Sequence, residues 1–314
     1  MSLPRVVADT PLNPVIESLL AGHVEILPWS VALAGSTVPV AAVYTYGHPL
    51  VDGQLLDRLP GVRVISNYGV GVDHIRLADA AARGIPVGNT PGILDGATAD
   101  MGFALLLAAA RRLSEGDRYA RSPAFTRYDP GYMLGREVHG QTLGIIGLGR
   151  IGRQVARRAA GFDMTVLYHN RRRDEAAERD LGVRYAQFEE LLAGSDFVML
   201  CCPLSDATRG LIGRDSLARM KPTAILVNIA RGPVVDTTAL TEALQSRRLY
   251  AAALDVTDPE PLPRDHPLLS LDNVTIAPHL GSATEQTRLK MAEISVENLL
   301  RGLAGEPLLF EVKG

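Results

Sequence analysis

Three glycines stand at the spacing G-x-G-x-x-G in the segment LGIIGLGRIGRQVARR, namely Gly147, Gly149 and Gly152. An apolar run precedes them and a helix-forming run follows, which is the context that a dinucleotide-binding turn requires. The first glycine would permit a tight bend, the second would let backbone approach a pyrophosphate, and the third would let helix and strand pack closely. The start of the helix would supply amide donors and partial positive charge. The spacing therefore predicts a dinucleotide site, with a ligand-free glycine turn as the alternative.

The segment VLYHNRRRD predicts which dinucleotide binds. Asn170 follows Gly147 by twenty-three residues, where an NAD-binding domain normally carries an acid for the ribose 2′-hydroxyl. In place of the acid stand Asn170, Arg171, Arg172 and Arg173, which can donate hydrogen bonds and charge to a 2′-phosphate. The sequence therefore favours NADP(H), with NAD(H) as the weaker alternative. The competing interpretation is an exposed, solvated arginine loop.

Three further segments carry polar residues after predicted strands. NIARGPVVD contains Arg231, LDVTDPEPLP contains Asp255 and Glu260, and IAPHLGSAT contains His279. Ligands of a doubly wound sheet bind beyond the carboxyl ends of its strands, so these residues could converge on one crevice. Each also has a simpler interpretation: Arg231 could pair with Asp236, Glu260 could be a solvated loop acid, and His279 could be a core histidine.

The elements that must position these residues alternate between strand and helix. In the first third of the chain a helical stretch is expected at 13–21, and short apolar runs predict strands at 5–8, 24–27, 41–44, 62–66 and 85–88. A buried apolar helix at 97–112 is expected to be the hinge between two domains. A second alternation predicts helices at 150–160, 189–193 and 238–246, and strands at 143–147, 165–169, 197–202, 224–229, 251–255 and 274–277.

These elements predict an α/β protein with two doubly wound parallel-sheet domains and a cleft between them. One is expected to be a flavodoxin-like substrate domain, formed by residues 1–96 and 284–314 because the helical stretch 285–301 returns to it. The other is expected to be a Rossmann dinucleotide-binding domain, residues 97–283.

Composition excludes several classes of protein. The chain has 314 residues, of which 46% are hydrophobic and 21% charged, so it should fold into about two domains. The net charge of −3 offers no positive field for nucleic acid or an anionic membrane. No export signal is visible, and the longest apolar run, 101–110, is too short to span a bilayer. The adjacent Cys201 and Cys202 are the only cysteines, which argues against a zinc site and favours the cytoplasm.

Several segments, covering nearly the whole chain, resemble the D-isomer-specific 2-hydroxyacid dehydrogenases. They are NYGVGVDHI, GNTPGILDGATADMGFALLLAAARR and HPLLSLDNVTIAPHLGSAT. Within that family, DVTDPEPLPRDHPLL and the NRR signature look most similar to the NADPH-dependent glyoxylate/hydroxypyruvate reductases. The resemblance implies hydride transfer from NADPH to a small 2-oxo acid, giving glycolate from glyoxylate or D-glycerate from hydroxypyruvate.

The resemblance also implies roles for individual residues. Arg231 would bind the carboxylate and carbonyl oxygen of the 2-oxo acid, for which a planar guanidinium is suited. His279 would be the general acid/base, with Glu260 orienting its ring. The loop amides of Val70 and Gly71 would hold the substrate carboxylate.

The cofactor would be lined by residues of the glycine turn and of the strand ends, with Asp255 meeting the nicotinamide carboxamide. The full set is Thr98, Gly147, Gly149, Arg150, Ile151, Gly152, Asn170, Arg171, Arg172, Cys202, Pro203, Thr208, Ile229, Asp255, His279 and Gly281. The resemblance further implies a homodimer formed largely by the cofactor domains. One departure is Tyr132, which stands where animal hydroxypyruvate reductases carry a partner-subunit tryptophan near the substrate.

Three other functions remain open at this point. The chain could be another 2-hydroxyacid dehydrogenase or a phosphite dehydrogenase, because these enzymes use overlapping residues. It could also be a non-catalytic, dinucleotide-sensing protein similar to the corepressors that resemble this family. Fold alone does not separate these functions.

Overall fold

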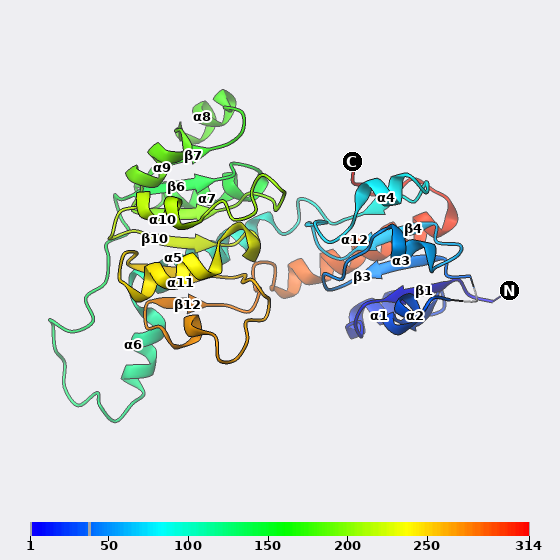
Figure 1. Ribbon diagram of the computed structural model, residues 1–314, viewed down its shortest axis with the longest axis horizontal. Coiled ribbons are helices and arrows are strands. Elements are labelled where there is room, and N and C mark those ends of the chain that lie inside the picture. Colours follow the sequence, from blue (N-terminus) through cyan, green and yellow to red (C-terminus); the bar gives the residue numbers. More distant parts are fainter. Residues whose placement is uncertain (1, 37–38, 314) are drawn as a thin grey trace. The chain divides into compact units, whose positions relative to one another are not determined.

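The computed structural model describes residues 2–36 and 39–313, and the chain divides into two compact units (Figure 1). The first unit is Met1–Leu94 with Thr284–Gly314, and the second is Asp95–Ala283. Over the described residues each unit contains one sheet, and all pairings between the named strands are parallel. The predicted α/β class with two parallel sheets is therefore confirmed.

The first unit has a five-stranded sheet in the order β2-β1-β3-β4-β5. Its strands are β1 (Arg5–Ala8), β2 (Glu25–Pro28), β3 (Ala42–Thr45), β4 (Val64–Asn67) and β5 (Val87–Gly88). Its helices are α1 (Pro14–Leu20), α2 (Trp29–Ala34), α3 (Gly53–Asp57), α4 (Leu77–Ala81) and α12 (Glu285–Ala304). The C-terminal helix α12 packs on β3, β4 and β5, so the two ends of the chain share this unit.

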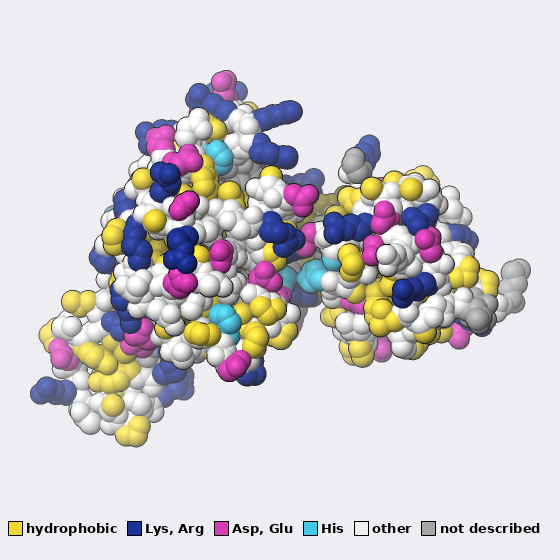
Figure 2. Space-filling model, viewed as in Figure 1, with side chains coloured by type: hydrophobic (Ala, Val, Ile, Leu, Met, Phe, Trp, Pro, Cys, Tyr) yellow, Lys and Arg dark blue, Asp and Glu magenta, His cyan; other side chains and the backbone are white. Residues whose placement is uncertain are grey.

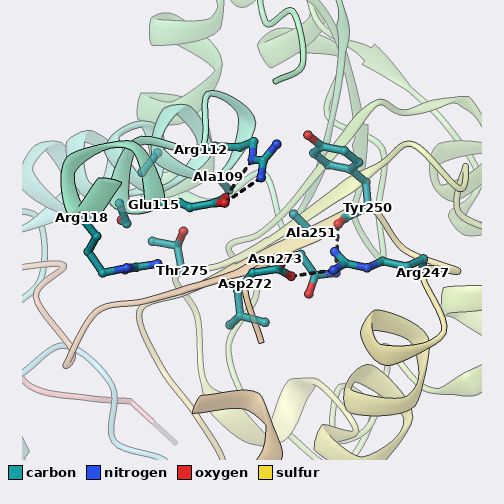
Figure 3. A pocket seen from close by; sticks show the side chains of 13 residues that line it. Ala109, Arg112, Glu115, Arg118, Arg247, Tyr250, Ala251, Asp272, Asn273 and Thr275 are labelled. Atoms are coloured by element: carbon teal, nitrogen blue, oxygen red, sulfur yellow. Dashed lines mark hydrogen bonds and ion pairs between the residues drawn. The ribbon is translucent and has the colours of Figure 1, made fainter. Parts of the chain in front are cut away.

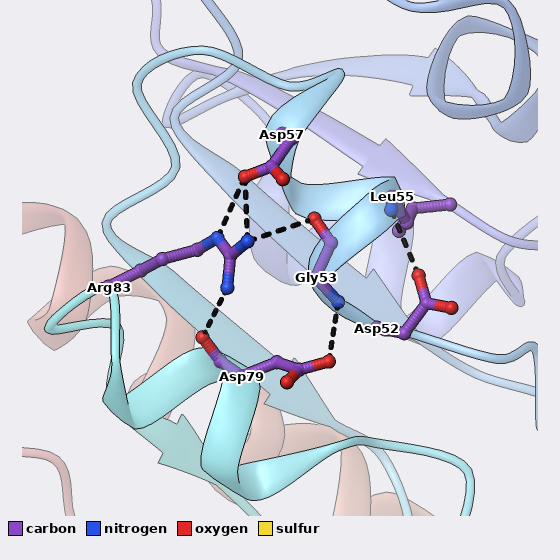
Figure 4. A network of polar contacts seen from close by, with 6 residues as sticks. All are labelled: Asp52, Gly53, Leu55, Asp57, Asp79 and Arg83. Atoms are coloured by element: carbon purple, nitrogen blue, oxygen red, sulfur yellow. Dashed lines mark hydrogen bonds and ion pairs between the residues drawn. The ribbon is translucent and has the colours of Figure 1, made fainter.

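One arginine joins the short helices α3 and α4 (Figure 4). Arg83 donates two hydrogen bonds to Asp57 Oδ1, at 2.9 and 2.7 Å, and one to the carbonyl of Asp79 at 2.9 Å. The Asp79 carboxylate in turn accepts the amide of Gly53 at 2.7 Å. These contacts fix helices of one or two turns, which are too short to be stable alone.

The second unit has a seven-stranded sheet in the order β12-β11-β10-β9-β6-β7-β8. Its strands are β6 (Thr142–Ile146), β7 (Thr165–His169), β8 (Arg184–Tyr185), β9 (Phe197–Leu200), β10 (Ile225–Asn228), β11 (Ala251–Leu254) and β12 (Val274–Ile276). Its α-helices are α5 (Asp95–Ala110), α6 (Leu113–Ala120), α7 (Arg150–Ala160), α8 (Glu175–Leu181), α9 (Phe188–Gly194), α10 (Arg214–Arg219) and α11 (Thr237–Gln245). Two 3-10 turns are η1 (Gly232–Val234) and η2 (Pro267–Ser270).

Both faces of the second sheet are buried, as its apolar strands require. Phe197 and Met199 of β9 belong to one core cluster, which includes residues of α5 and α7. Val198 and Leu200 belong to the other, which includes residues of α9 and α11. Because successive side chains of a strand point to opposite faces, helices cover this sheet on both sides.

The strand order of the second sheet indicates where a ligand would bind. Strand β6 lies between β7 and β9, so the chain leaves β6 in one direction along the sheet and later returns to its other side. Ligands of open α/β sheets bind beyond the carboxyl ends of strands at such a switch point. The glycine motif follows β6 directly. Among the described residues, no helix combines the length and apolarity needed to cross a membrane.

Candidate active site

The glycine motif forms the turn between β6 and α7. Gly147 has a φ of +98°, and a Cβ there would lie 2.6 Å from the backbone nitrogen of Cys202. A Cβ at Gly152 would collide with the carbonyl oxygen of Gly147, so only glycine lets α7 approach the turn this closely. At Gly149 a Cβ would meet nothing within 4 Å. The turn is thus closed on the protein side and open at the start of α7, as binding of a pyrophosphate requires.

In the segment 170–173 after β7, two side chains bind other parts of the protein and two are exposed to solvent. The Oδ1 of Asn170 accepts the amide of Leu148 at 2.7 Å, so this side chain ties the end of β7 to the glycine turn. Arg173 donates to both carboxylate oxygens of Glu178, at 2.8 and 2.7 Å. Arg171 and Arg172 are exposed, and Figure 2 shows Lys and Arg side chains gathered around α8 and the loop before it.

Asp255 fastens the turn that follows β12. Its Oδ1 and Oδ2 accept the amides of Leu280 and Gly281 at 2.7 and 2.8 Å, and its carbonyl accepts the amide of His279 at 2.8 Å. Burial raises the pKa of the Asp255 carboxyl, and the two amide hydrogen bonds oppose that rise. The sequence did not reveal this contact, because the two segments are far apart in the chain. A Cβ at Gly281 would also lie 3.3 Å from Cγ2 of Thr98 on α5, so backbone and helix are in close contact there.

His279 is held in an unusual backbone conformation and paired with an acid. Its φ is +56°, a left-handed conformation that costs an L-residue about 1–2 kcal/mol and therefore needs support from the surrounding turn. Its Nδ1 lies 2.7 Å from Oε1 of Glu260, whose Oε2 accepts the amide of Thr257 at 3.2 Å. The His279 side chain is 31% exposed, so an incoming molecule can reach the ring. The expected carboxylate–imidazole pair is therefore present in the structure.

The Arg231 turn follows β10, at the edge of the sheet where the carboxyl ends of its strands lie. Asn228 holds it, accepting the amide of Ala230 and donating to the carbonyl of Arg231, both at 3.0 Å. The Nη1 of Arg231 donates to the carbonyl of Ala230 at 2.8 Å. A Cβ at Gly232 would collide with the carbonyl of Thr257, so this turn packs directly on the loop that carries Glu260. The sequence did not single out Asn228, which reads there as the polar end of a strand, as the residue that holds this turn.

A chain of contacts therefore joins the three catalytic candidates. Gly232 packs on Thr257, Thr257 donates to Glu260, and Glu260 binds His279. Because β6, β10, β11 and β12 are parallel members of one sheet, these loops share an edge with the glycine turn. The edge can orient an anionic substrate with a guanidinium and transfer a proton with an imidazole.

The remaining cofactor candidates fall into different environments. Thr208 Oγ1 donates to the carbonyl of Pro203 at 2.7 Å, which fixes the loop after β9. The side chain of Ile229 is buried in the core, so it could meet a ligand only through its backbone. Arg150 and Ile151 lie in the first turn of α7, and Arg150 is exposed. Cys202 is buried, and burial raises the pKa of its thiol to about 11, which leaves it protonated near neutral pH.

Comparisons with known proteins identify the family of this chain. Residues 103–281 match the D-isomer specific 2-hydroxyacid dehydrogenase, NAD binding domain family. The chain is 50% identical to a glyoxylate reductase of Korarchaeum cryptofilum over 257 residues, covering 82% of this chain and 77% of the relative. The chain belongs to the D-isomer specific 2-hydroxyacid dehydrogenases.

Two further relatives of this dehydrogenase cover it almost completely. A glyoxylate reductase of Aeropyrum pernix is 42% identical over 317 residues, covering 98% of this chain and 95% of the relative. The crystal structure of an NADPH-dependent glyoxylate/hydroxypyruvate reductase from Sinorhizobium meliloti, in complex with NADP and malonate, has a TM-score of 0.91 and 31% identity. That match covers 99% of this chain and 97% of the other.

The predicted substrate loop of this dehydrogenase follows β4 in the first unit. Val70 and Gly71 are both half-buried. Their loop begins directly after the buried Asn67 and Tyr68, at the carboxyl end of a parallel strand. Within the first unit, the backbone of this loop accepts hydrogen bonds from side chains.

A polar cavity of about 210 Å³ lies elsewhere in the dehydrogenase (Figure 3). Ala251 and Val274, at the amino ends of β11 and β12, line it together with Arg112, between α5 and α6, and residues of both helices. None of the predicted site residues lines it. The cavity is therefore at the opposite edge of the sheet from His279.

Proposed function

We propose that this dehydrogenase reduces a small 2-oxo acid with NADPH, converting glyoxylate to glycolate or hydroxypyruvate to D-glycerate. The observation that carries the proposal is the His279–Glu260 hydrogen bond of 2.7 Å, on loops that pack against the Arg231 turn. The same sheet edge carries the open glycine turn. Glyoxylate reductases among the relatives support the choice of substrate.

The proposed chemistry assigns one step to each side chain. Arg231 binds the carboxylate and the carbonyl oxygen of the 2-oxo acid, which orients the substrate and polarises the carbonyl bond. Glu260 holds Nδ1 of His279, and Nε2 gives a proton to the oxygen at C2 as it becomes an alkoxide. The reduced nicotinamide of NADPH, when bound, supplies the hydride to C2. One hydride and one proton together convert the carbonyl into the hydroxyl.

The residues present fit a dinucleotide. A side chain at Gly147 or Gly152 would collide with neighbouring backbone, whereas the space beside Gly149 is open. Buried Asp255 carries its carboxylate at the same edge, where we propose that it meets the carboxamide of the nicotinamide while holding the turn that follows β12. Arg171 and Arg172 are the proposed ligands of the 2′-phosphate.

Substrate selection is tested by a panel of acids. We expect oxidation of NADPH, followed at 340 nm, with glyoxylate and hydroxypyruvate and less with pyruvate. Activity with another 2-oxo acid alone would make the protein a different dehydrogenase of this family, and phosphite oxidation with NADP would point to phosphite chemistry. Turnover of none of these compounds by a folded protein that binds NADPH would contradict the proposal and favour a dinucleotide sensor.

Cofactor preference is tested at the basic run. We expect a lower KM for NADPH than for NADH. Arg171→Ala and Arg172→Ala should each raise the KM for NADPH by about tenfold, the loss of one charged hydrogen bond, and leave that for NADH nearly unchanged. Arg173→Ala should have a smaller effect, since Glu178 already binds that guanidinium. A wild-type preference for NADH would overturn the assignment.

We also propose that the second unit binds the cofactor, that the first binds the substrate carboxylate, and that two copies associate. The arm formed by α6 and the loop after it exposes several large apolar side chains (Figure 2). Among them are Leu134, which is 70% exposed, Tyr128 and Tyr132. Such a surface is typical of a buried interface. The location that we propose is the cytoplasm.

Association through the arm gives a direct expectation. The protein should sediment as a dimer, and Leu134→Asp should shift it towards monomer because a charge would enter an apolar contact. The matched change Leu33→Asp, at another exposed leucine outside the arm, should leave the dimer intact. A wild-type protein that sediments as a monomer at micromolar concentration would remove the dimer from the proposal.

A further inference from the structure

In the loop after β4, residues 68–71 and here called the substrate loop, every carbonyl accepts a hydrogen bond from a side chain. The carbonyl of Tyr68 accepts Thr90 Oγ1 at 2.9 Å, and that of Val70 accepts Asn89 Nδ2 at 2.9 Å. The carbonyls of Gly69 and Gly71 both accept Nδ2 of one residue, Asn67, at 2.8 and 2.9 Å. Four consecutive carbonyls are thereby held by three polar side chains.

The amides of this loop are in the opposite situation. Within residues 2–36 and 39–313, the N–H groups of Gly69, Val70 and Gly71 donate to no acceptor. These residues are only half-buried. Adjacent amides without internal acceptors can together bind an anionic oxygen. The loop therefore offers donors to a carboxylate from outside.

Peptide geometry connects these two observations. The carbonyl of one residue and the amide of the next belong to the same trans peptide and point in opposite directions. Asn67 holds the carbonyl of Gly69 and so directs the amide of Val70, while Asn89 holds the carbonyl of Val70 and so directs the amide of Gly71. Each amide expected to bind substrate is thus aimed by a different asparagine.

The two asparagines are themselves fixed. Asn67 is 2% exposed at the end of β4, and its Oδ1 accepts Thr45 Oγ1 at 2.8 Å. The backbone carbonyl of Asn89 accepts Nδ2 of Asn298 on α12 at 3.0 Å. A carboxamide is the group needed at Asn67, because one side chain must donate to two carbonyls and accept from a hydroxyl. An aspartate would instead place a negative charge behind the amides that receive an anion.

We propose that Asn67 and Asn89 are positioning residues that aim the amides of Val70 and Gly71 at the carboxylate of the substrate. The inference rests on the proposed function, since it requires a carboxylate substrate. It goes beyond that function by assigning affinity for the acid to two side chains that do not touch it. The carboxylate does not change during the reaction, so its binding is uniform between ground state and transition state.

The experiment separates KM from kcat. We expect Asn89→Ala to raise the KM for glyoxylate about tenfold, with kcat within about twofold of wild type, because one charged hydrogen bond is misaligned. Asn89→Asp should raise KM further, since it adds charge as well as removing the donor. The Kd for NADPH, measured by fluorescence, should not change in either variant. Asn67→Ser tests the second asparagine, because serine leaves a shorter donor at this position. Its KM and kcat for glyoxylate are compared with those of wild type in the same way.

The matched control is Asn273→Ala. Its Nδ2 also donates to two carbonyls, those of Leu244 and Tyr250, at 3.3 and 3.1 Å, but in the second unit. It should lower the unfolding temperature without raising the KM for glyoxylate. If Asn89→Ala and Asn89→Asp both keep the wild-type KM, the inference is wrong while the proposed function stands. If wild type reduces no 2-oxo acid, both fail.

Discussion

Replacing His279 by alanine is expected to lower kcat for glyoxylate by about 10²- to 10⁴-fold, the usual contribution of a general acid. The imidazole is held at Nδ1 by Glu260, and alanine leaves no group to protonate the developing alkoxide. Steady-state rates of NADPH oxidation at saturating glyoxylate would measure this loss. Circular dichroism and the Kd for NADPH should stay near wild type.

The control for His279 is another histidine beside a carboxylate. His139 lies 3.5 Å from Asp163 in the second unit, with both side chains more than half exposed. His139→Ala should leave kcat unchanged. Glu260→Gln should fall between the two variants, because the amide oxygen can still accept from Nδ1 but the charge that stabilises the imidazolium is lost. Full turnover in His279→Ala would exclude the assigned role.

Replacing Arg231 by lysine is expected to lower kcat/KM for glyoxylate by about 100-fold. Lysine keeps the charge but cannot place two parallel donors on a carboxylate and a carbonyl oxygen. Weakening two charged hydrogen bonds by about 1.4 kcal/mol each accounts for a factor of this size. Initial rates at low glyoxylate concentration give kcat/KM directly, and the Kd for NADPH should not change.

An arginine elsewhere in the unit serves as the control for Arg231. Arg214, on α10, pairs with Glu242 at 2.5 Å and is 70% exposed. Arg214→Lys should retain full kcat/KM, because an exposed ion pair contributes little and lysine can replace it. Wild-type kcat/KM in Arg231→Lys would show that charge alone is sufficient and that bidentate binding of the oxo acid is wrong.

Local patterns predicted much of the scaffold. Helix α7 and strand β7 have the predicted bounds, 150–160 and 165–169. Alternation of apolar runs and the glycine spacing depend on neighbours in the chain, so they are visible without coordinates. The short helices α3, α4, α8 and α10 were not predicted individually. Such helices depend on caps and packing more than on periodicity, as at α8, where Asp174 accepts the amide of Ala177 at 3.0 Å.

Strand ends were less well predicted than strand cores. The strand expected at 197–202 ends at Leu200, and the one expected at 224–229 ends at Asn228. Cys201 and Cys202 therefore follow β9, and Ile229 follows β10. The apolar pattern continues past these strand ends because Cys202 and Ile229 are buried without belonging to a strand.

The α/β class, the glycine turn and the residue types available for chemistry were predictable, since each depends on short-range spacing. The contacts of Asp255 with the His279 turn and of Arg173 with Glu178 became visible only in the folded chain. The same is true of the hydrogen bonds from Asn67 and Asn89 to the carbonyls of the loop after β4. A hydrogen bond requires atoms within about 3 Å in a defined direction. Sequence separation carries little information about that distance once the sheet has brought distant strand ends together.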